Sequence, residues 1–127
     1  TRYPLVTGVQ TCALPISLSK FDIGQSIVIN NGYVLAIEGP EGTDETIKRS
    51  VYLSKKYKLK NKSILVKFPK IKQDLRVDLP TIGIDTVKNC IKANIKGIAV
   101  KRFQNIILDR DKIISLTKKN NFFIISL

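Results

Sequence analysis

The sequence predicts an α/β fold, a layered domain with a mixed β-sheet flanked by about three helices. Short apolar runs of strand length alternate along the chain with stretches of helical periodicity, which is typical of a layered α/β domain. The first two runs, residues 25–30 and 33–38, are joined at Asn31-Gly32. Because this pair favours a two-residue turn, the two runs are expected to form a hairpin.

The first predicted helix covers residues 43–57. Thr43 is expected to be its N-cap, and the acids that follow it complement the positive end of the helix dipole. The residues expected on its inner edge are Ile47, Val51 and either Leu53 or Ser54.

The rest of the chain continues the alternation. Apolar runs bounded by polar residues predict strands at residues 63–68, 97–100, 105–108 and 122–127. Apolar residues at helical spacing predict helices over residues 85–94 and 109–120. The inward-facing residues of these two helices are expected to be Val87, Ile91 and Ile95, then Ile113, Leu116 and Ile114.

The N-terminal segment has an unusual sequence. Residues 6–16 read VTGVQTCALPI, which resembles the translation of a widely used sequencing adapter. We therefore expect residues 1–17 to be non-native, and residues 18–127 to form one domain from the C-terminal part of a longer protein. The alternative is an ordinary apolar strand.

The chain is strongly basic, with 22 Lys and Arg against 10 Asp and Glu and a formal net charge of +12. This charge is compatible with a nucleic-acid-binding module, although such a module needs aromatic residues on a basic face. A strong use of Ile, Lys and Asn explains the charge through AT-rich coding, so we expect solvated lysines and no nucleic-acid partner. The lysine-rich run 55–62 is interpreted as a solvated helix end, with a membrane-surface role as the alternative.

The amino acids that are missing exclude several chemistries. The chain contains no histidine, which excludes Ser–His–Asp and Cys–His catalysis and histidine-ligated zinc within it. Cys90 is the one cysteine beyond the adapter-like segment, and we expect it to be a small buried hydrophobic residue.

Residues 67–83, KFPKIKQDLRVDLPTIG, carry the main functional signal. Charged and apolar residues alternate from Asp74 to Leu79, which predicts an extended segment with one polar face. In a regular strand Asp74 and Asp78 would lie about 13 Å apart, so a bend is needed for them to converge. Carboxylates with nearby lysines suit a phosphate substrate and a hard metal ion, whereas an edge strand protected by charges is an equal alternative.

A second candidate site is the segment EGPEGTD, residues 38–44. Two glycines before a predicted helix can present backbone N–H groups to an anion. Glu41 and Asp44 oppose a naked phosphate unless a cation intervenes. Spacing alone therefore favours a simple strand-to-helix turn.

Four segments in order resemble the C-terminal domain of the UDP-2,3-diacylglucosamine diphosphatase (pyrophosphatase) family of lipid A biosynthesis, the type unrelated to metallophosphoesterases. They are FDIGQS (21–26), EGTD (41–44), QDLRVDLPTIG (73–83) and GIAV (97–100). The resemblance implies hydrolysis of UDP-2,3-diacylglucosamine to UMP and 2,3-diacylglucosamine 1-phosphate, lipid X. Water attacks the β-phosphorus, and Mg²⁺ is the implied cofactor.

The resemblance also implies site residues. The implied catalytic residues are Asp74, Arg76, Asp78 and Lys67, with Asp74 and Asp78 as metal ligands. The implied substrate-binding residues are Glu41, Thr43, Asp44, Gln73, Thr81 and Gly83. We expect the EGTD turn to lie close to the QDLRVD segment.

The implied partners are the substrate, an N-terminal domain that this chain lacks, and the cytoplasmic face of the inner membrane, where the protein would be peripheral. The substrate would lie between the two domains, so this chain alone is expected to be inactive. Homodimer formation is left open. A sugar-nucleotide-binding domain without turnover is the remaining alternative.

Overall fold

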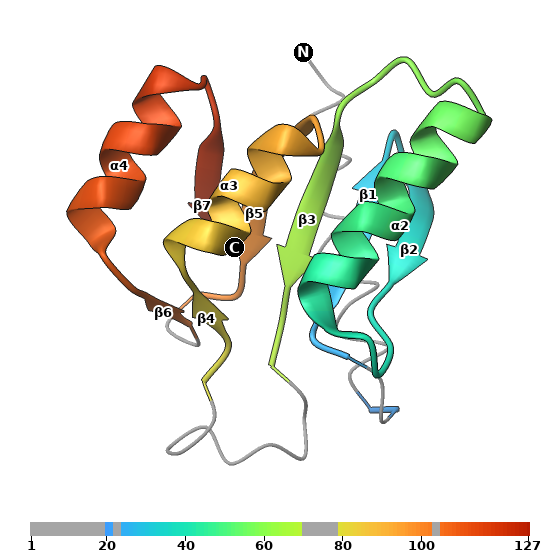
Figure 1. The fold of residues 1–127 in the computed structure, drawn as a ribbon. Coiled ribbons are helices and arrows are strands. Elements are labelled where there is room, and N and C mark those ends of the chain that lie inside the picture. The colour runs from blue at the N-terminus through green and yellow to red at the C-terminus, as the bar shows by residue number, and fades with distance from the viewer. Residues whose placement is uncertain (1–19, 22–23, 70–78, 103–104) are drawn as a thin grey trace.

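The computed structural model describes residues 20–21, 24–69, 79–102 and 105–127. Within them, five strands form a mixed sheet in the order β2-β1-β3-β5-β7 (Figure 1). These strands are β1 Ser26–Asn30, β2 Tyr33–Ile37, β3 Ser63–Lys67, β5 Ile95–Val100 and β7 Phe123–Ser126. The predicted α/β class with a mixed sheet is confirmed.

The predicted hairpin at Asn31-Gly32 is also confirmed. β1 and β2 pair antiparallel, with Asn30 opposite Tyr33. Asn31 and Gly32 have φ of 48° and 85°, so both central residues of the turn are left-handed. This is the conformation that a two-residue hairpin with native twist requires, and Asn and Gly adopt it at low cost.

Strand directions define two ends of the sheet. β1 is antiparallel to both β2 and β3, whereas β3, β5 and β7 are mutually parallel along the sheet. Hence β2, β3, β5 and β7 all end on the same side, which we call the carboxyl edge. The opposite side, where β3 and β5 begin, is called the amino edge.

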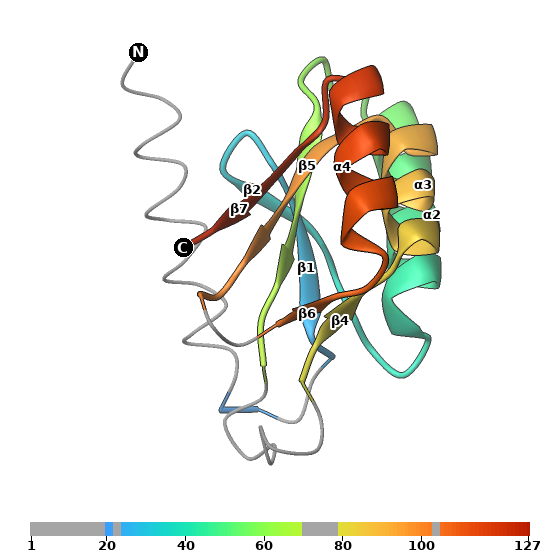
Figure 2. The same ribbon diagram turned by 90° about the vertical axis from the view of Figure 1, so that its left-hand side faces the viewer.

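In the part of the chain that the structure describes, three helices cover one face of this sheet (Figure 2). They are α2 Gly42–Lys56, α3 Ile84–Lys92 and α4 Arg110–Lys119. Alternate strand residues such as Val28, Leu65 and Ile98 pack with the buried helix residues Ile47, Val87 and Cys90 in the main core. The intervening strand residues form a second buried cluster on the other face, made of Ile27, Ile29, Val66, Phe68 and Ala99.

Some helix predictions were wrong in detail. α2 begins at Gly42 after Glu41, so Thr43 lies inside the first turn and is not the N-cap. Ile114 is 39% exposed, because α4 turns only its Ile113 and Leu116 side toward the core. In α3, Cys90 is fully buried, as expected, while Ile91 is partly buried.

The predicted strand at 105–108 lies outside the main sheet. Its central residues form β6, Ile106–Ile107, which pairs in parallel with β4, Thr81–Ile82. This small sheet forms because two connections run from the carboxyl edge to a helix, one leading into α3 and one into α4. β4 and β6 are the paired parts of these two connections. β4 therefore connects the carboxyl edge to α3.

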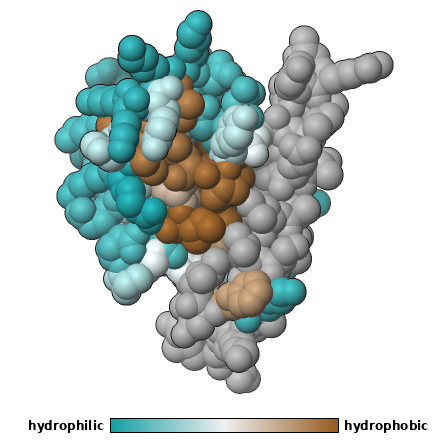
Figure 3. All heavy atoms as spheres, turned by 90° about the vertical axis from the view of Figure 1, so that its right-hand side faces the viewer, coloured by the Kyte–Doolittle hydropathy of each residue, from teal (hydrophilic) through white to brown (hydrophobic). Residues whose placement is uncertain are grey.

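Seen from the side of α2 and β2, the described residues show an apolar area in the centre, with hydrophilic side chains to the left of it and above it (Figure 3). β2 is an edge strand of the five-stranded sheet. Its residues Tyr33 and Val34 are 73% and 41% exposed. No helix in the described residues is long and apolar enough to cross a membrane.

Candidate functional site at the carboxyl edge

Lys67 is the most unusual described residue at the carboxyl edge. It is the last residue of β3, opposite Ser26 of β1 and Val100 of β5. Only 7% of the residue is exposed. Its Nζ donates a hydrogen bond to the carbonyl oxygen of Thr81 at 3.2 Å, so β3 is tied to β4.

The charge of Lys67 is poorly compensated in the described part of the chain. Burial lowers the pKa of Lys67, and the negative charges of Glu38 and, to a smaller extent, Asp44 partly oppose this shift. The two ion pairs found among the described residues, Lys48–Glu45 and Arg49–Glu41, lie on exposed parts of α2. Because a buried ammonium group without a counter-ion is costly, Lys67 is suited to receive an anion.

Glu38 lies beside this lysine and was not among the predicted site residues. Its carboxylate accepts hydrogen bonds from the hydroxyl groups of Ser26 and of Thr43, the latter at 2.8 Å. Ser26 is fully buried. The sequence signals for Glu38 are its position directly after β2 and at the start of the candidate segment 38–44, although no role was predicted for it.

The other two acidic residues of the segment 38–44, Glu41 and Asp44, form hydrogen bonds away from Glu38. Glu41 accepts a hydrogen bond from Arg49 at 2.6 Å. Its own backbone N–H and Arg49 lower the pKa of Glu41. Asp44 accepts a hydrogen bond from Asn89 of α3 at 3.1 Å. Thus Glu41 is bonded to a residue of α2, and Asp44 links α2 to α3. Of the EGTD residues, Thr43 is the one that forms a hydrogen bond with Glu38.

Thr81 and Gly83 lie where the chain enters α3. The Thr81 carbonyl accepts from Lys67, whereas its exposed side-chain hydroxyl donates to the carbonyl of Leu79 at 3.2 Å. Gly83 directly precedes α3, and a Cβ added to it would meet no atom within 4 Å. The described part of the chain therefore leaves open space beside the first turn of α3.

Gln73, Asp74, Arg76 and Asp78 lie outside the described residues, so their roles remain predictions. Both described ends of that segment are attached near Lys67. The N–H of Phe68, the residue after Lys67, donates to the carbonyl of Gln25 at 2.9 Å. After the segment, the chain reaches Thr81, the partner of Lys67.

The described residues alone do not fit a magnesium site. No group of three or more His, Cys, Asp or Glu side chains able to hold a metal occurs among them. Glu38, Glu41 and Asp44 accept hydrogen bonds from hydroxyl, guanidinium and amide donors. The metal ligands that the resemblance implies, Asp74 and Asp78, lie outside the described residues.

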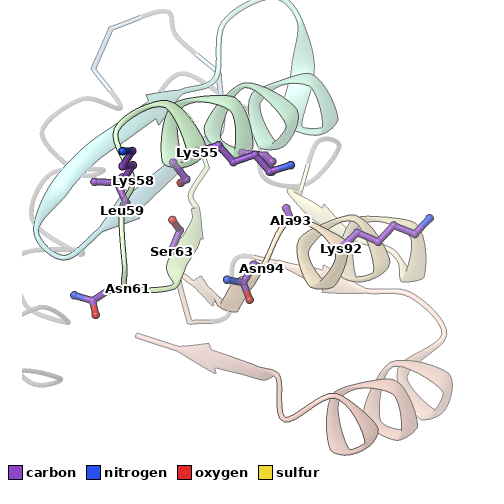
Figure 4. A pocket seen from close by; sticks show the side chains of 10 residues that line it. Lys55, Lys58, Leu59, Asn61, Ser63, Lys92, Ala93 and Asn94 are labelled. Atoms are coloured by element: carbon purple, nitrogen blue, oxygen red, sulfur yellow. The ribbon is translucent and has the colours of Figure 1, made fainter.

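A pocket of about 370 Å³ lies at the amino edge, at the opposite end of β3 from Lys67. It is lined by the C-terminal parts of α2 and α3 and by Ser63 at the start of β3. Of its lysines, Lys58 and Lys92 point away from each other (Figure 4). Lysines near helix C-termini are favourable for the helix dipole, so this pocket needs no ligand to explain its charge.

Comparison with known proteins agrees with the family resemblance of the sequence motifs. A family model described as "LpxI C-terminal domain" matches residues 8–125. Over 111 residues the chain is 33% identical to a protein of Caulobacter vibrioides named UDP-2,3-diacylglucosamine pyrophosphatase LpxI. That alignment covers 85% of this chain, and the chain spans about 40% of the length of the relative. This chain belongs to the LpxI C-terminal domain family.

Proposed function

We propose that this chain supplies the C-terminal part of a pyrophosphatase that hydrolyses UDP-2,3-diacylglucosamine to UMP and 2,3-diacylglucosamine 1-phosphate. Family membership and the name of the Caulobacter relative support this activity. The structural observation that carries it is the buried Lys67 ammonium group, which has no carboxylate ion-pair partner among the described residues. A diphosphate is an anion of the kind that such a group binds.

In this proposal the pyrophosphate lies at the carboxyl edge, with Lys67 facing its oxygens. The N-terminal turns of α2 and α3 add backbone N–H groups and the positive ends of two helix dipoles. Arg76 would supply a further cation. These groups stabilise the negative charge that grows on the bridging oxygen as the bond breaks.

The proposed reaction places water on the β-phosphorus. The new P–O bond forms to the phosphate that stays with the acylated sugar. The bond from the β-phosphorus to the bridging oxygen breaks, and that oxygen leaves with UMP. Asp74 or Asp78 would orient the water or hold Mg²⁺, which, when bound, would neutralise phosphate oxygens.

The remaining proposals rest on the resemblance. An N-terminal domain outside this chain would close over the substrate, with Glu41, Asp44, Gln73, Thr81 and Gly83 supporting it from this side. The enzyme would act as a peripheral protein at the cytoplasmic face of the inner membrane, where a diacylated substrate is accessible. Homodimer formation is not needed for this arrangement.

A hybrid protein tests the proposed function. In it, this chain replaces the matching 111 residues of the Caulobacter relative, and the unmodified relative is the positive control. The hybrid is expected to release UMP from UDP-2,3-diacylglucosamine, while this chain alone is expected to release none. A folded hybrid without activity beside an active relative would refute the proposal.

Water labelled with ¹⁸O tests the direction of attack in the same hybrid. The label is expected in 2,3-diacylglucosamine 1-phosphate, and its appearance in UMP would show attack on the α-phosphorus instead. Full activity in the presence of a chelator would exclude Mg²⁺ from the proposed site. Full activity in both Asp74→Asn and Asp78→Asn would exclude the two aspartates.

A further inference from the structure

Glu38 holds two hydroxyl protons at the carboxyl edge. Its carboxylate lies within hydrogen-bond distance of the Ser26 and Thr43 hydroxyls, and the two hydroxyl oxygens lie 3.3 Å apart. A carboxylate can only accept, and a threonine hydroxyl has one proton and two lone pairs. The Thr43 proton therefore points at Glu38, which leaves the lone pairs of Thr43 Oγ1 for other partners.

The backbone around Glu38 fixes this geometry. The N–H of Glu38 donates to the carbonyl of Ser26, and the N–H of Gly24 donates to the carbonyl of Glu38, both at 2.9 Å. A Cβ on Gly24 would lie 2.4 Å from Cγ of Glu38. A side chain at residue 24 is therefore incompatible with the present place of Glu38.

Phosphate oxygens are acceptors, so a Thr43 hydroxyl whose proton is held by Glu38 cannot donate to them. It can accept a hydrogen bond from a water molecule. Ser26 is paired in register with Lys67, so this acceptor belongs to the same end of the sheet as the buried ammonium group. The arrangement thus separates two tasks, anion binding by Lys67 and water orientation by Thr43.

We propose that Glu38 is a positioning residue of the pyrophosphatase site, which holds the Thr43 hydroxyl as a hydrogen-bond acceptor for the attacking water. This inference rests on the proposed function, and it changes the predicted role of Thr43 from substrate binding to the orientation of water. Glu38 itself does not touch the substrate. Gly24 and Ser26 act with it by fixing the carboxylate.

Steady-state kinetics of the hybrid protein test the proposal. Glu38→Gln, Gly24→Ala and Thr43→Val are each expected to lower kcat about tenfold or more with little change in KM, because water orientation matters in the transition state. Thr43→Ser keeps the hydroxyl and is expected to restore most of the activity. Glu45→Gln is the matched control, since Glu45 lies in the same helical turn but pairs with the exposed Lys48.

A wild-type kcat in folded Glu38→Gln, or a loss confined to KM, would overturn the proposal. A hybrid that releases no UMP would instead refute the proposed function. In that case, amide NMR spectra of this chain test whether Glu38 holds the Ser26 and Thr43 hydroxyl groups. Glu38→Gln is expected to shift the Ser26 and Thr43 amide signals, whereas Glu45→Gln leaves Ser26 in place. Unshifted Ser26 and Thr43 signals in Glu38→Gln would disprove the network.

Discussion

The Nζ atom of Lys67 donates a 3.2 Å hydrogen bond to the carbonyl oxygen of Thr81. This contact joins the end of β3 to β4, which leads directly into α3. It also keeps a positive charge buried at the edge where four of the five strands of the main sheet end. An apolar side chain of similar length would fill the same space at a lower desolvation cost, which is compatible with the proposed anion-binding role of Lys67.

Replacing Lys67 is therefore expected to stabilise the fold. Lys67→Met keeps the length and removes the buried charge together with its desolvation cost, so the free energy of unfolding is expected to rise. Urea unfolding at pH 7 measures the change. A loss of several kcal/mol would show that the Thr81 contact is a structural necessity.

The same variant has a defined pH dependence. The pKa of Lys67 is lowered in the fold from its ordinary value of 10.5, so the unfolded chain binds more protons between the folded pKa and 10.5. The folded wild type thus gains stability as pH rises through this range, and it loses that contribution as pH falls through the folded pKa. The stability advantage of Lys67→Met is expected to shrink between pH 7 and pH 10, and an advantage that grows would contradict the burial of the charge.

Cys90 is expected to be unreactive in the folded chain. Burial raises its pKa from 9.0 to about 12, against the opposing effect of Lys67. A shift of this size reduces the thiolate fraction at pH 8 about a thousandfold, and the thiolate is the reactive form. In a Cys12→Ser variant, Ellman's reagent is expected to label Cys90 only after denaturant is added, and rapid labelling without denaturant would contradict its burial.

Two glycines provide a matched test of packing. A Cβ on Gly97 would lie 2.4 Å from the ring of Phe123, its partner on β7. Gly97→Ala is expected to lower the free energy of unfolding by about 1–3 kcal/mol, because the ring must move. In a Phe123→Ala background this cost is expected to disappear, and an unchanged cost would place its origin elsewhere.

Gly83→Ala is the control for that experiment. Gly83 has extended backbone angles, φ −102° and ψ 169°, and no atom of the described residues lies within 4 Å of an added Cβ. Its effect on the free energy of unfolding is expected to stay within about 0.5 kcal/mol, as for surface changes without a packing role. A larger loss of stability would show that the space beside α3 is filled.

The sequence predicted the hairpin, the strands of the main sheet and the three helices, because each depends on local periodicity and turn chemistry. It did not predict β4 or its pairing with β6, since two-residue strands have no periodicity to detect. The exposure of Ile114 depends on which side of α4 meets the core, and this is decided by tertiary packing.

For the site, the family resemblance implied Lys67, Thr43 and Thr81, whose hydrogen bonds the fold now shows. Glu38 could not be predicted, because its partners Ser26 and Thr43 come together only when β1, β2 and α2 are assembled. The same applies to Glu41 and Asp44, whose hydrogen bonds to Arg49 and Asn89 depend on helix placement. Asp74, Arg76 and Asp78 remain predictions from the motif.

The most direct test of the diphosphate site compares Lys67→Met with Lys92→Met in the hybrid protein. Both variants remove one lysine charge, but Lys92 lines the pocket at the amino edge. Lys67→Met is expected to remain folded and to lose kcat/KM for UDP-2,3-diacylglucosamine by about a hundredfold or more, as for a group that stabilises transition-state charge, while Lys92→Met stays close to wild type. Normal turnover in Lys67→Met, or an equal loss in Lys92→Met, would contradict the placement of the pyrophosphate at the carboxyl edge.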